Sequence, residues 1–289
     1  MAEKRTLEAY FAPSAKRQRE ADDKPVSTSK HKSYPFDIIE IPEALAEQLL
    51  PPNAPVKPGK NIDNRQDLNI LYYNPFIPKL CTRQLFEFLR TELPFYRVEW
   101  TTVFGLDETS RFKNGSVVDA KSEVLVSDRL YDRYPPRPIP QCLDTLRRST
   151  EAATGFKFNF CLVNYYASGA DSISYHSDDE KFLGPEPAIA SFSLGAQRDF
   201  LMKHKTAAPG SLKLVLGSGD MVLMRGKTQS QWLHSIPKRT GKHGEDGGRI
   251  NITFRRAVTK DGTENYYNYN VGRGPVYRWD RTRREMKQA

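Results

Sequence analysis

The sequence predicts an α+β fold that is mainly β, a double-stranded β-helix (jelly roll) with N-terminal helices packed on one sheet. Two observations predict it. Helical periodicity is confined to segments that end before residue 155. Beyond them come short segments rich in β-branched and aromatic residues, separated by Gly, Pro, Asp and Ser. Short strands at such regular spacing are typical of antiparallel sandwiches and barrels.

Two segments have the spacing of amphipathic helices. Between Thr82 and Leu93 apolar residues recur every three or four positions, and Thr82 is placed to cap the first turn. The segment from Ile139 to Thr154 has the same pattern, and Gly155 follows it as a stop. The expected strands lie in the segments 156–166, 188–195, 198–204, 212–226, 232–237 and 249–256.

The chain divides into four parts by composition. Residues 1–34 are polar and charged and are expected to form a disordered arm. Residues 35–74 contain several prolines and are expected to be a loop-rich lead-in to the globular domain at 75–256. Residues 257–289 form a basic tail rich in Tyr and Arg, which should wrap around the domain or fray.

Charge and composition limit the partners. The net charge is +9 and the pI is near 9.3, which favours a polyanionic partner, most often nucleic acid; a basic surface that serves only solubility is the alternative. No apolar run approaches the roughly 18 residues that cross a bilayer, and no signal-peptide core opens the sequence. Cys81, Cys142 and Cys161 have no metal-binding spacing. We therefore expect an intracellular, soluble monomer with reduced thiols.

Two islands interrupt the polar arm. Leu7, Tyr10 and Phe11 would share one face of a helical turn, and they resemble the peptide that docks on the sliding clamp of DNA replication. Lys4 stands where such peptides carry glutamine. An accidental apolar cluster is the alternative. The basic run Lys16–Arg19 is either a nuclear import signal, which predicts a nuclear protein, or a solvated cluster.

Three residues have the chemistry of a metal site. His176 and Asp178 are two positions apart, so in an extended segment both side chains leave the same face. His234, at the edge of another expected strand, would complete the set of two histidines and one carboxylate that non-haem Fe(II) oxygenases use. The triplet alone favours a chance pattern with an ordinary core histidine.

The last expected strand strengthens the case for a ligand site. Arg249, Thr253 and Arg255 alternate along it and would face one way, and two guanidinium groups on an otherwise apolar strand need an anion. A dicarboxylate that also chelates iron would satisfy them. Asn164 and Tyr166 share a face of an earlier strand and could hydrogen-bond the same molecule. Internal salt bridges are the alternative.

The runs at 164–180, 187–200, 234–237 and 249–255 together resemble the AlkB family of Fe(II)- and 2-oxoglutarate-dependent dioxygenases, most closely the DNA-dealkylating branch with the mammalian homologues two and three. The resemblance covers residues 75–256, so this part is expected to be a dioxygenase domain. It implies Fe(II) ligands at His176, Asp178 and His234. It also implies 2-oxoglutarate-binding residues at Asn164, Tyr166, Arg249, Thr253 and Arg255.

The same resemblance implies a substrate and a reaction. Asp179 and Glu180 match residues that contact the damaged base, and a carboxylate suits the positive ring of 1-methyladenine or 3-methylcytosine. The family hydroxylates the N-methyl group, which then leaves as formaldehyde and restores the base. A base in duplex DNA must first be flipped out. The implied function is direct-reversal repair of alkylated DNA.

The segment that covers the base departs from the family pattern. Thr101–Asp107 resembles the base-covering strand, and Phe104 within it is a candidate substrate contact. The Pro-Arg pair that should precede it is absent, which predicts a shortened nucleotide lid. The alternative is that Val103, Phe104 and Gly105 form an intercalating finger. Phe112 is a further candidate for stacking on a base.

Three other functions are compatible with parts of the sequence. An RNA demethylase would use the same chemistry, because readers of single strands need not exclude a 2′-hydroxyl group. A non-catalytic nucleic-acid or clamp-binding module on a degenerate jelly roll would not need the complete ligand set. Protein hydroxylation is disfavoured by the basic charge and by the pair Asp179 and Glu180.

Overall fold

The computed structural model describes most of the predicted domain and parts of the segments around it. Eleven stretches are described: 27–31, 34–49, 58–96, 101–105, 112–113, 116–117, 138–178, 181–206, 210–239, 247–258 and 275–289, with 101–105, 112–113 and 116–117 as backbone alone. The clamp-like peptide and the basic run of the arm lie outside these residues. At the end of the arm, β1 (Thr28–Ser29) pairs with β2 (Ile38–Ile39).

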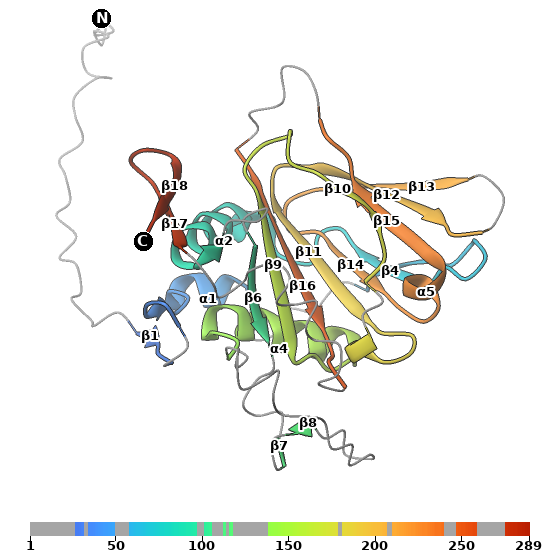
Figure 1. The fold of residues 1–289 in the computed structure, drawn as a ribbon, viewed down its shortest axis with the longest axis horizontal. Helices are drawn as coiled ribbons and strands as arrows, with labels where there is room; N and C mark the ends of the chain where they lie inside the picture. Colours follow the sequence, from blue (N-terminus) through green and yellow to red (C-terminus); the bar gives the residue numbers. More distant parts are fainter. Residues whose placement is uncertain are drawn as a thin grey trace, which may run out of the picture.

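Two antiparallel sheets form the body of the molecule (Figure 1). The large sheet has the order β18-β17-β5-β6-β9-β16-β11-β14-β4-β3, and the small sheet has the order β10-β15-β12-β13. The strands of the large sheet are β3 (Lys60–Ile62), β4 (Ile70–Tyr73), β5 (Phe95–Tyr96), β6 (Thr101–Gly105), β9 (Phe160–Tyr166), β11 (Ile189–Gly195), β14 (Met221–Met224), β16 (Arg249–Arg255), β17 (Val276–Asp280) and β18 (Glu285–Gln288). Those of the small sheet are β10 (Ile173–His176), β12 (Arg198–His204), β13 (Ser211–Leu216) and β15 (Trp232–Ile236). This arrangement confirms the predicted mainly β fold.

Three helices cover the face of the large sheet that points away from the small sheet (Figure 1). They are α1 (Glu43–Leu49), α2 (Lys79–Glu92) and α4 (Gln141–Thr154). Shorter elements are α5 (Thr228–Gln231), the 3-10 turn η2 (Lys181–Leu183) and the pair β7 (Phe112–Lys113) and β8 (Ser116–Val117). None of the helices among the described residues is long and apolar enough to cross a membrane.

The helix ends test the sequence reading in detail. The α4 helix ends as predicted, because Gly155 adopts a left-handed φ of 75° and its N–H bonds to the carbonyl of Glu151. The prediction that Thr82 caps α2 is wrong. The cap position is Pro78, and the Thr82 hydroxyl, one turn inside the helix, donates to the carbonyl of Lys79. Proline suits this place because its fixed φ and missing N–H cost nothing there.

The alternation of β16 divides the interior into two cores. Ile250, Ile252 and Phe254 pack against the helices on one face of the strand. The side chains that alternate with these face the core between the two sheets. They are Arg249, Asn251, Thr253 and Arg255. That second core is lined by aromatic and aliphatic residues of both sheets. The polar positions of β16 are therefore buried between the two sheets.

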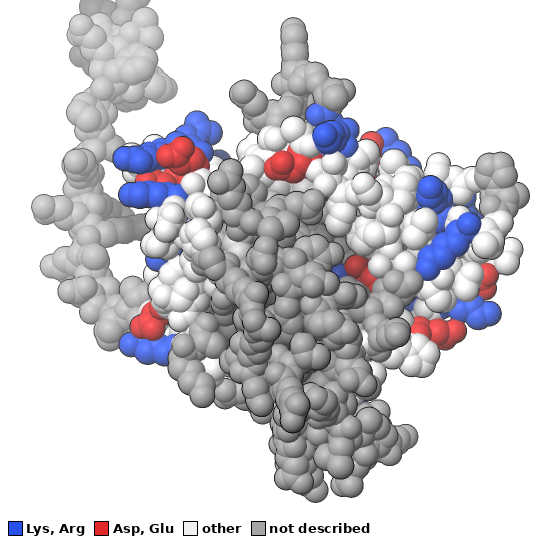
Figure 2. Space-filling model, in the orientation of Figure 1, with Lys and Arg blue, Asp and Glu red and all other residues white. Residues whose placement is uncertain are grey.

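Segments outside the predicted domain contribute to the large sheet. Residues 60–73, placed in the lead-in by the sequence reading, provide β3 and β4 at one edge. The described end of the tail forms the hairpin β17–β18, which extends the other edge by pairing with β5. In the view of Figure 2, the Lys and Arg side chains lie in separate groups, one of them at this hairpin. Cys81, Cys142 and Cys161 are buried and unpaired, as predicted.

Candidate functional site

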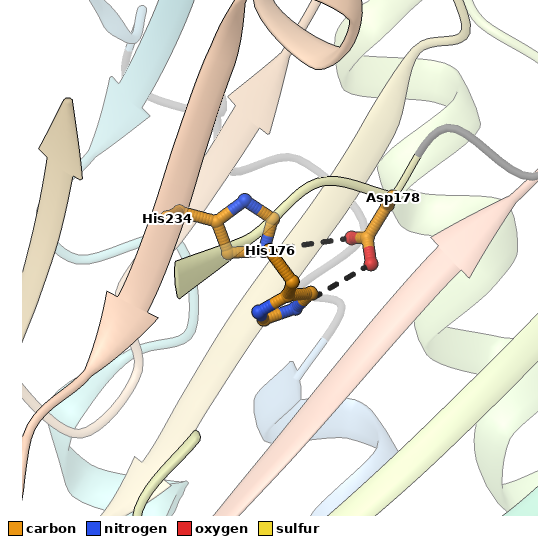
Figure 3. A group of neighbouring side chains, drawn as sticks. All are labelled: His176, Asp178 and His234. Atoms are coloured by element: carbon orange, nitrogen blue, oxygen red, sulfur yellow. Dashed lines mark ion pairs between the residues drawn. The ribbon is translucent and has the colours of Figure 1, made fainter. Parts of the chain in front are cut away.

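The three predicted metal ligands lie together at the end of β10 (Figure 3). Pairing of β10 with β15 places His176 opposite His234, and the ring centroids are 4.2 Å apart. Asp178 follows two residues after the strand, and its carboxylate oxygens lie 3.8 Å from the Nε2 atoms of both histidines. All three ligand atoms lie within 4.8 Å of one another. The structure therefore brings together residues that are 58 positions apart along the chain.

Hydrogen bonding and burial prepare both imidazoles for metal binding. Nδ1 of His176 lies 2.8 Å from the carbonyl oxygen of Ser174. Because a carbonyl only accepts, Nδ1 carries a proton, which leaves Nε2 as the ring nitrogen that can bind a metal. Burial lowers the pKa of His234 to about 4, so this ring is neutral at pH 7. Phe200 stacks on it at 5.2 Å.

Asp178 is an ionised carboxylate in a buried position. Burial opposes its ionisation, but the guanidinium of Arg255 and the two histidines outweigh burial and lower the pKa of Asp178. Nη2 of Arg255 donates to Oδ1 at 2.8 Å, and the backbone N–H of Asp178 donates to Oε1 of Gln229 at 3.1 Å. Two imidazole nitrogens and one fixed carboxylate on one side of a point fit a divalent transition metal such as Fe(II).

Arg249 is the least satisfied cation of the inter-sheet core. It is 1% exposed and lies opposite Tyr166 on β9. Its Nη2 donates to Oγ of Ser193 at 2.8 Å, but its Nε and Nη1 have no hydrogen-bond partner among the described residues. Burial lowers the pKa of Arg249, yet a guanidinium stays protonated in proteins. Buried donors without acceptors are costly, so this position fits the carboxylate of a ligand.

The other predicted 2-oxoglutarate residues share the face of Arg249. Asn164 and Tyr166 alternate on β9, which pairs with β16 along its whole length. Thr253 and Arg255 continue the same face of β16, and Thr253 donates to the carbonyl of Leu162 at 3.3 Å. The five residues therefore line one buried surface that ends at Asp178 through Arg255.

The sequence reading missed the residue that holds the two histidine strands in place. Arg198 is 2% exposed and donates to the carbonyls of Ser168 at 3.3 Å, of Asp171 at 2.7 Å and of Pro237 at 2.7 Å. These carbonyls belong to the loop before β10 and the end of β15. The signal was present, because the alternation of β12 gives Arg198 the same inward face as Phe200.

The predicted substrate residues lie next to the metal ligands in the sequence and on β6. Asp179 and Glu180 lie outside the described residues, although Asp178 immediately before them is described. Phe104 lies in β6, whose backbone pairs with β9 from Thr101 to Gly105. The backbone of this segment is thus a strand of the large sheet beside the strand that carries Asn164. Leu7, Tyr10 and Phe11 lie outside the described residues, and the backbone of Phe112 lies in β7.

Comparison with known proteins identifies the family. The model of the 2OG-Fe(II) oxygenase superfamily matches residues 70–255, which include both histidines, Asp178 and the arginine-bearing strand. The chain belongs to this superfamily. The predicted enzyme class, an Fe(II)- and 2-oxoglutarate-dependent dioxygenase, and its two cofactors are thereby confirmed.

Individual relatives place the chain in the AlkB family. It is 32% identical over 231 residues to DNA oxidative demethylase ALKBH2 of Arabidopsis thaliana, covering 70% of each chain. It is 38% identical over 130 residues to human DNA oxidative demethylase ALKBH2, covering 43% of this chain and 49% of the relative. It is 38% identical over 136 residues to rat alpha-ketoglutarate-dependent dioxygenase alkB homolog 3, covering 43% and 45%. The alignments thus span about half the length of these mammalian relatives and confirm the resemblance to their branch.

The ion pair of Asp178 makes a prediction for the metal-free protein. Asp178→Ala should lower the free energy of unfolding by about 3–5 kcal/mol, because it removes one partner of a buried ion pair. His176→Ala, at a partly exposed side chain, should cost less than about 1 kcal/mol. Urea unfolding in the presence of a chelator measures both values. Equal losses in the two variants would contradict the account of the ion pair.

Proposed function

We propose that the chain is a DNA oxidative demethylase that removes methyl groups from N-alkylated bases such as 1-methyladenine and 3-methylcytosine by direct reversal. The observation that carries the proposal is the continuous buried surface from Arg249 to Asp178. It joins a dicarboxylate-binding cation to a set of iron ligands. Relatives named DNA oxidative demethylase are 32% identical to the chain over 231 residues and 38% identical over 130 residues.

In this proposal each polar residue of the surface has a role. His176, Asp178 and His234 hold Fe(II), as two imidazole nitrogens beside an ionised carboxylate favour. The bound iron, with 2-oxoglutarate and O₂, supplies the oxidising power that hydroxylates a methyl C–H bond. The five residues of the co-substrate surface hold 2-oxoglutarate: Asn164, Tyr166, Arg249, Thr253 and Arg255.

The chain's own contribution is positioning and exclusion of water. Arg255 fixes one oxygen of Asp178, and Gln229 fixes the backbone of the same residue. Arg198 ties the loop before β10 to the end of β15, so the two histidines keep their separation. Phe200 covers one face of His234. A preorganised, dry site directs the reaction to the methyl carbon and away from side reactions.

Recognition of the base is assigned to residues at the entrance. Asp179 and Glu180 follow the metal ligand Asp178 directly, so their carboxylates would meet a base delivered to the iron. A negative group there favours a positively charged methylated ring over its neutral parent base. Phe104 of β6 is the aromatic residue that we assign to stacking on the base. The net charge of +9 supports binding of the DNA backbone.

The function is tested with oligonucleotides that carry 1-methyladenine or 3-methylcytosine, incubated with Fe(II), ascorbate and 2-oxoglutarate. Mass spectrometry should show loss of one methylene from the DNA, dependent on 2-oxoglutarate and abolished in His176→Ala. Matched RNA oligonucleotides form the second arm. A faster reaction on RNA would identify RNA, and not DNA, as the substrate. An iron-loaded protein that leaves both polymers unchanged would refute the proposal.

We also propose that the protein acts in the nucleus, beside the replication clamp. The clamp-like spacing of Leu7, Tyr10 and Phe11 and the basic run Lys16–Arg19 support this location. Tyr10→Ala with Phe11→Ala should abolish capture of the protein on immobilised clamp, because the aromatic pair fills the partner's groove. Unchanged capture would exclude this partner site, and Glu8→Ala, between the apolar positions, serves as the control.

A further inference from the structure

A second cavity, of about 810 Å³, lies between α2, the residues just before β16 and the hairpin β17–β18. Tyr165 lines it from β9 and packs in the helix-side core. Its neighbour Tyr166 belongs to the core between the sheets. Because successive residues of a strand point to opposite faces, the cavity lies across the large sheet from the candidate iron site.

The wall of this cavity carries an excess of positive charge. Arg83 and Arg90 come from α2, and Arg281 and Arg284 come from the hairpin, whereas Glu87 is the one acidic side chain among the lining residues. Glu87 is already paired with Arg83 at 3.1 Å. The helix α2 and the hairpin β17–β18, distant in the sequence, therefore both place arginines at the cavity. The lining carries little negative charge to balance them.

Three of these arginines form no ion pair with any described residue. Nη1 of Arg90 donates to the carbonyl of Gly247 at 3.3 Å, and Nε of Arg281 donates to the hydroxyl of Thr91 at 3.1 Å. Neither acceptor carries a charge. By contrast, Arg278 on the same hairpin is paired with Glu92 at 2.7 Å. Convergent cations without a carboxylate attract an anion from solution.

Aromatic rings fix one of the cations in place. The guanidinium carbon of Arg90 lies 4.0 Å from the ring centroid of Trp279 and 4.7 Å from that of Phe86. Tyr165 meets Trp279 edge-on at 6.0 Å. Arginines combined with aromatic rings are the chemistry that follows the phosphates of a nucleic-acid strand. The volume lies in the range of about 300–1,000 Å³ that suits ligands of nucleotide size, which is larger than an inorganic phosphate needs.

We propose that this cavity is a second binding site for the phosphodiester backbone of a nucleic-acid strand, on the opposite face of the large sheet from the reacting base. Figure 2 shows Lys and Arg side chains at the hairpin beside it, with acidic side chains among them. The inference rests on the proposed function only in taking nucleic acid as the polyanion. Strand binding here would add affinity without contacting the methylated base.

The test is binding of a labelled, unmodified single-stranded oligonucleotide, followed by fluorescence anisotropy without iron. Arg281→Gln with Arg284→Gln should raise Kd at least about tenfold at low salt. It should also reduce the slope of log Kd against log salt by about 1.4, which corresponds to two lost phosphate contacts. The assay contains neither lesion nor cofactor, so failure of the demethylase reaction would not affect its outcome.

The matched control is Arg283→Gln with Lys287→Gln, which removes the same charge from the same hairpin outside the cavity lining. Its Kd should stay within about twofold of wild type, and equal weakening in both variants would overturn the proposal in favour of unspecific attraction.

AMP is titrated in parallel. Loss of AMP binding with unchanged oligonucleotide binding would make the cavity a free-nucleotide site instead. If circular dichroism shows that the hairpin variant misfolds, Arg90→Gln on α2 tests the opposite wall in the same assay, and an unchanged Kd there overturns the proposal.

Discussion

The ion pair between Asp178 and Arg255 joins the two sheets of the jelly roll at the iron site. Asp178 follows the end of β10 in the small sheet, and Arg255 ends β16 in the large sheet. Both side chains are buried, and at this depth the opposite charge of each favours the charged form of the other. The pair keeps the carboxylate ionised for a metal and orients one of its oxygens. The contact therefore fixes the metal-binding carboxylate at the end of the polar face of β16.

From Arg255 the polar face of β16 leads to Arg249, whose free donors lie in the same core. A strand with apolar residues on one face and arginines on the other, both buried, is unstable without a ligand or internal anions. The Asp178 carboxylate neutralises the Arg255 end, and in our proposal a dicarboxylate completes the Arg249 end. The same strand thus supports the helix-side core with Ile250, Ile252 and Phe254 and provides the site on its other face. The alternation of apolar and polar residues along β16 thus serves both the core and the candidate site.

Features of the protein that follow from local sequence patterns, such as this alternation, could be predicted from the sequence. The strand segments, the end of α4 at Gly155 and the spacing of His176 and Asp178 are local patterns, and they predicted the fold and the candidate site. The roles of Arg198 and Gln229 depend on which loop carbonyl or backbone N–H lies nearby, which only the tertiary structure supplies. The hairpin β17–β18 was also missed as an element, because its short strands are stabilised by pairing with β5 and not by their own pattern.

The central claim is that an iron site and a dicarboxylate site share this buried surface. Anaerobic calorimetry tests it directly, with Fe(II) titrated first and 2-oxoglutarate second. Wild type should bind iron and then 2-oxoglutarate, His176→Ala should lose iron binding, and Arg249→Gln should bind iron normally but 2-oxoglutarate at least about tenfold more weakly. Failure of the wild-type protein to take up iron, or normal 2-oxoglutarate affinity in Arg249→Gln, would contradict the account.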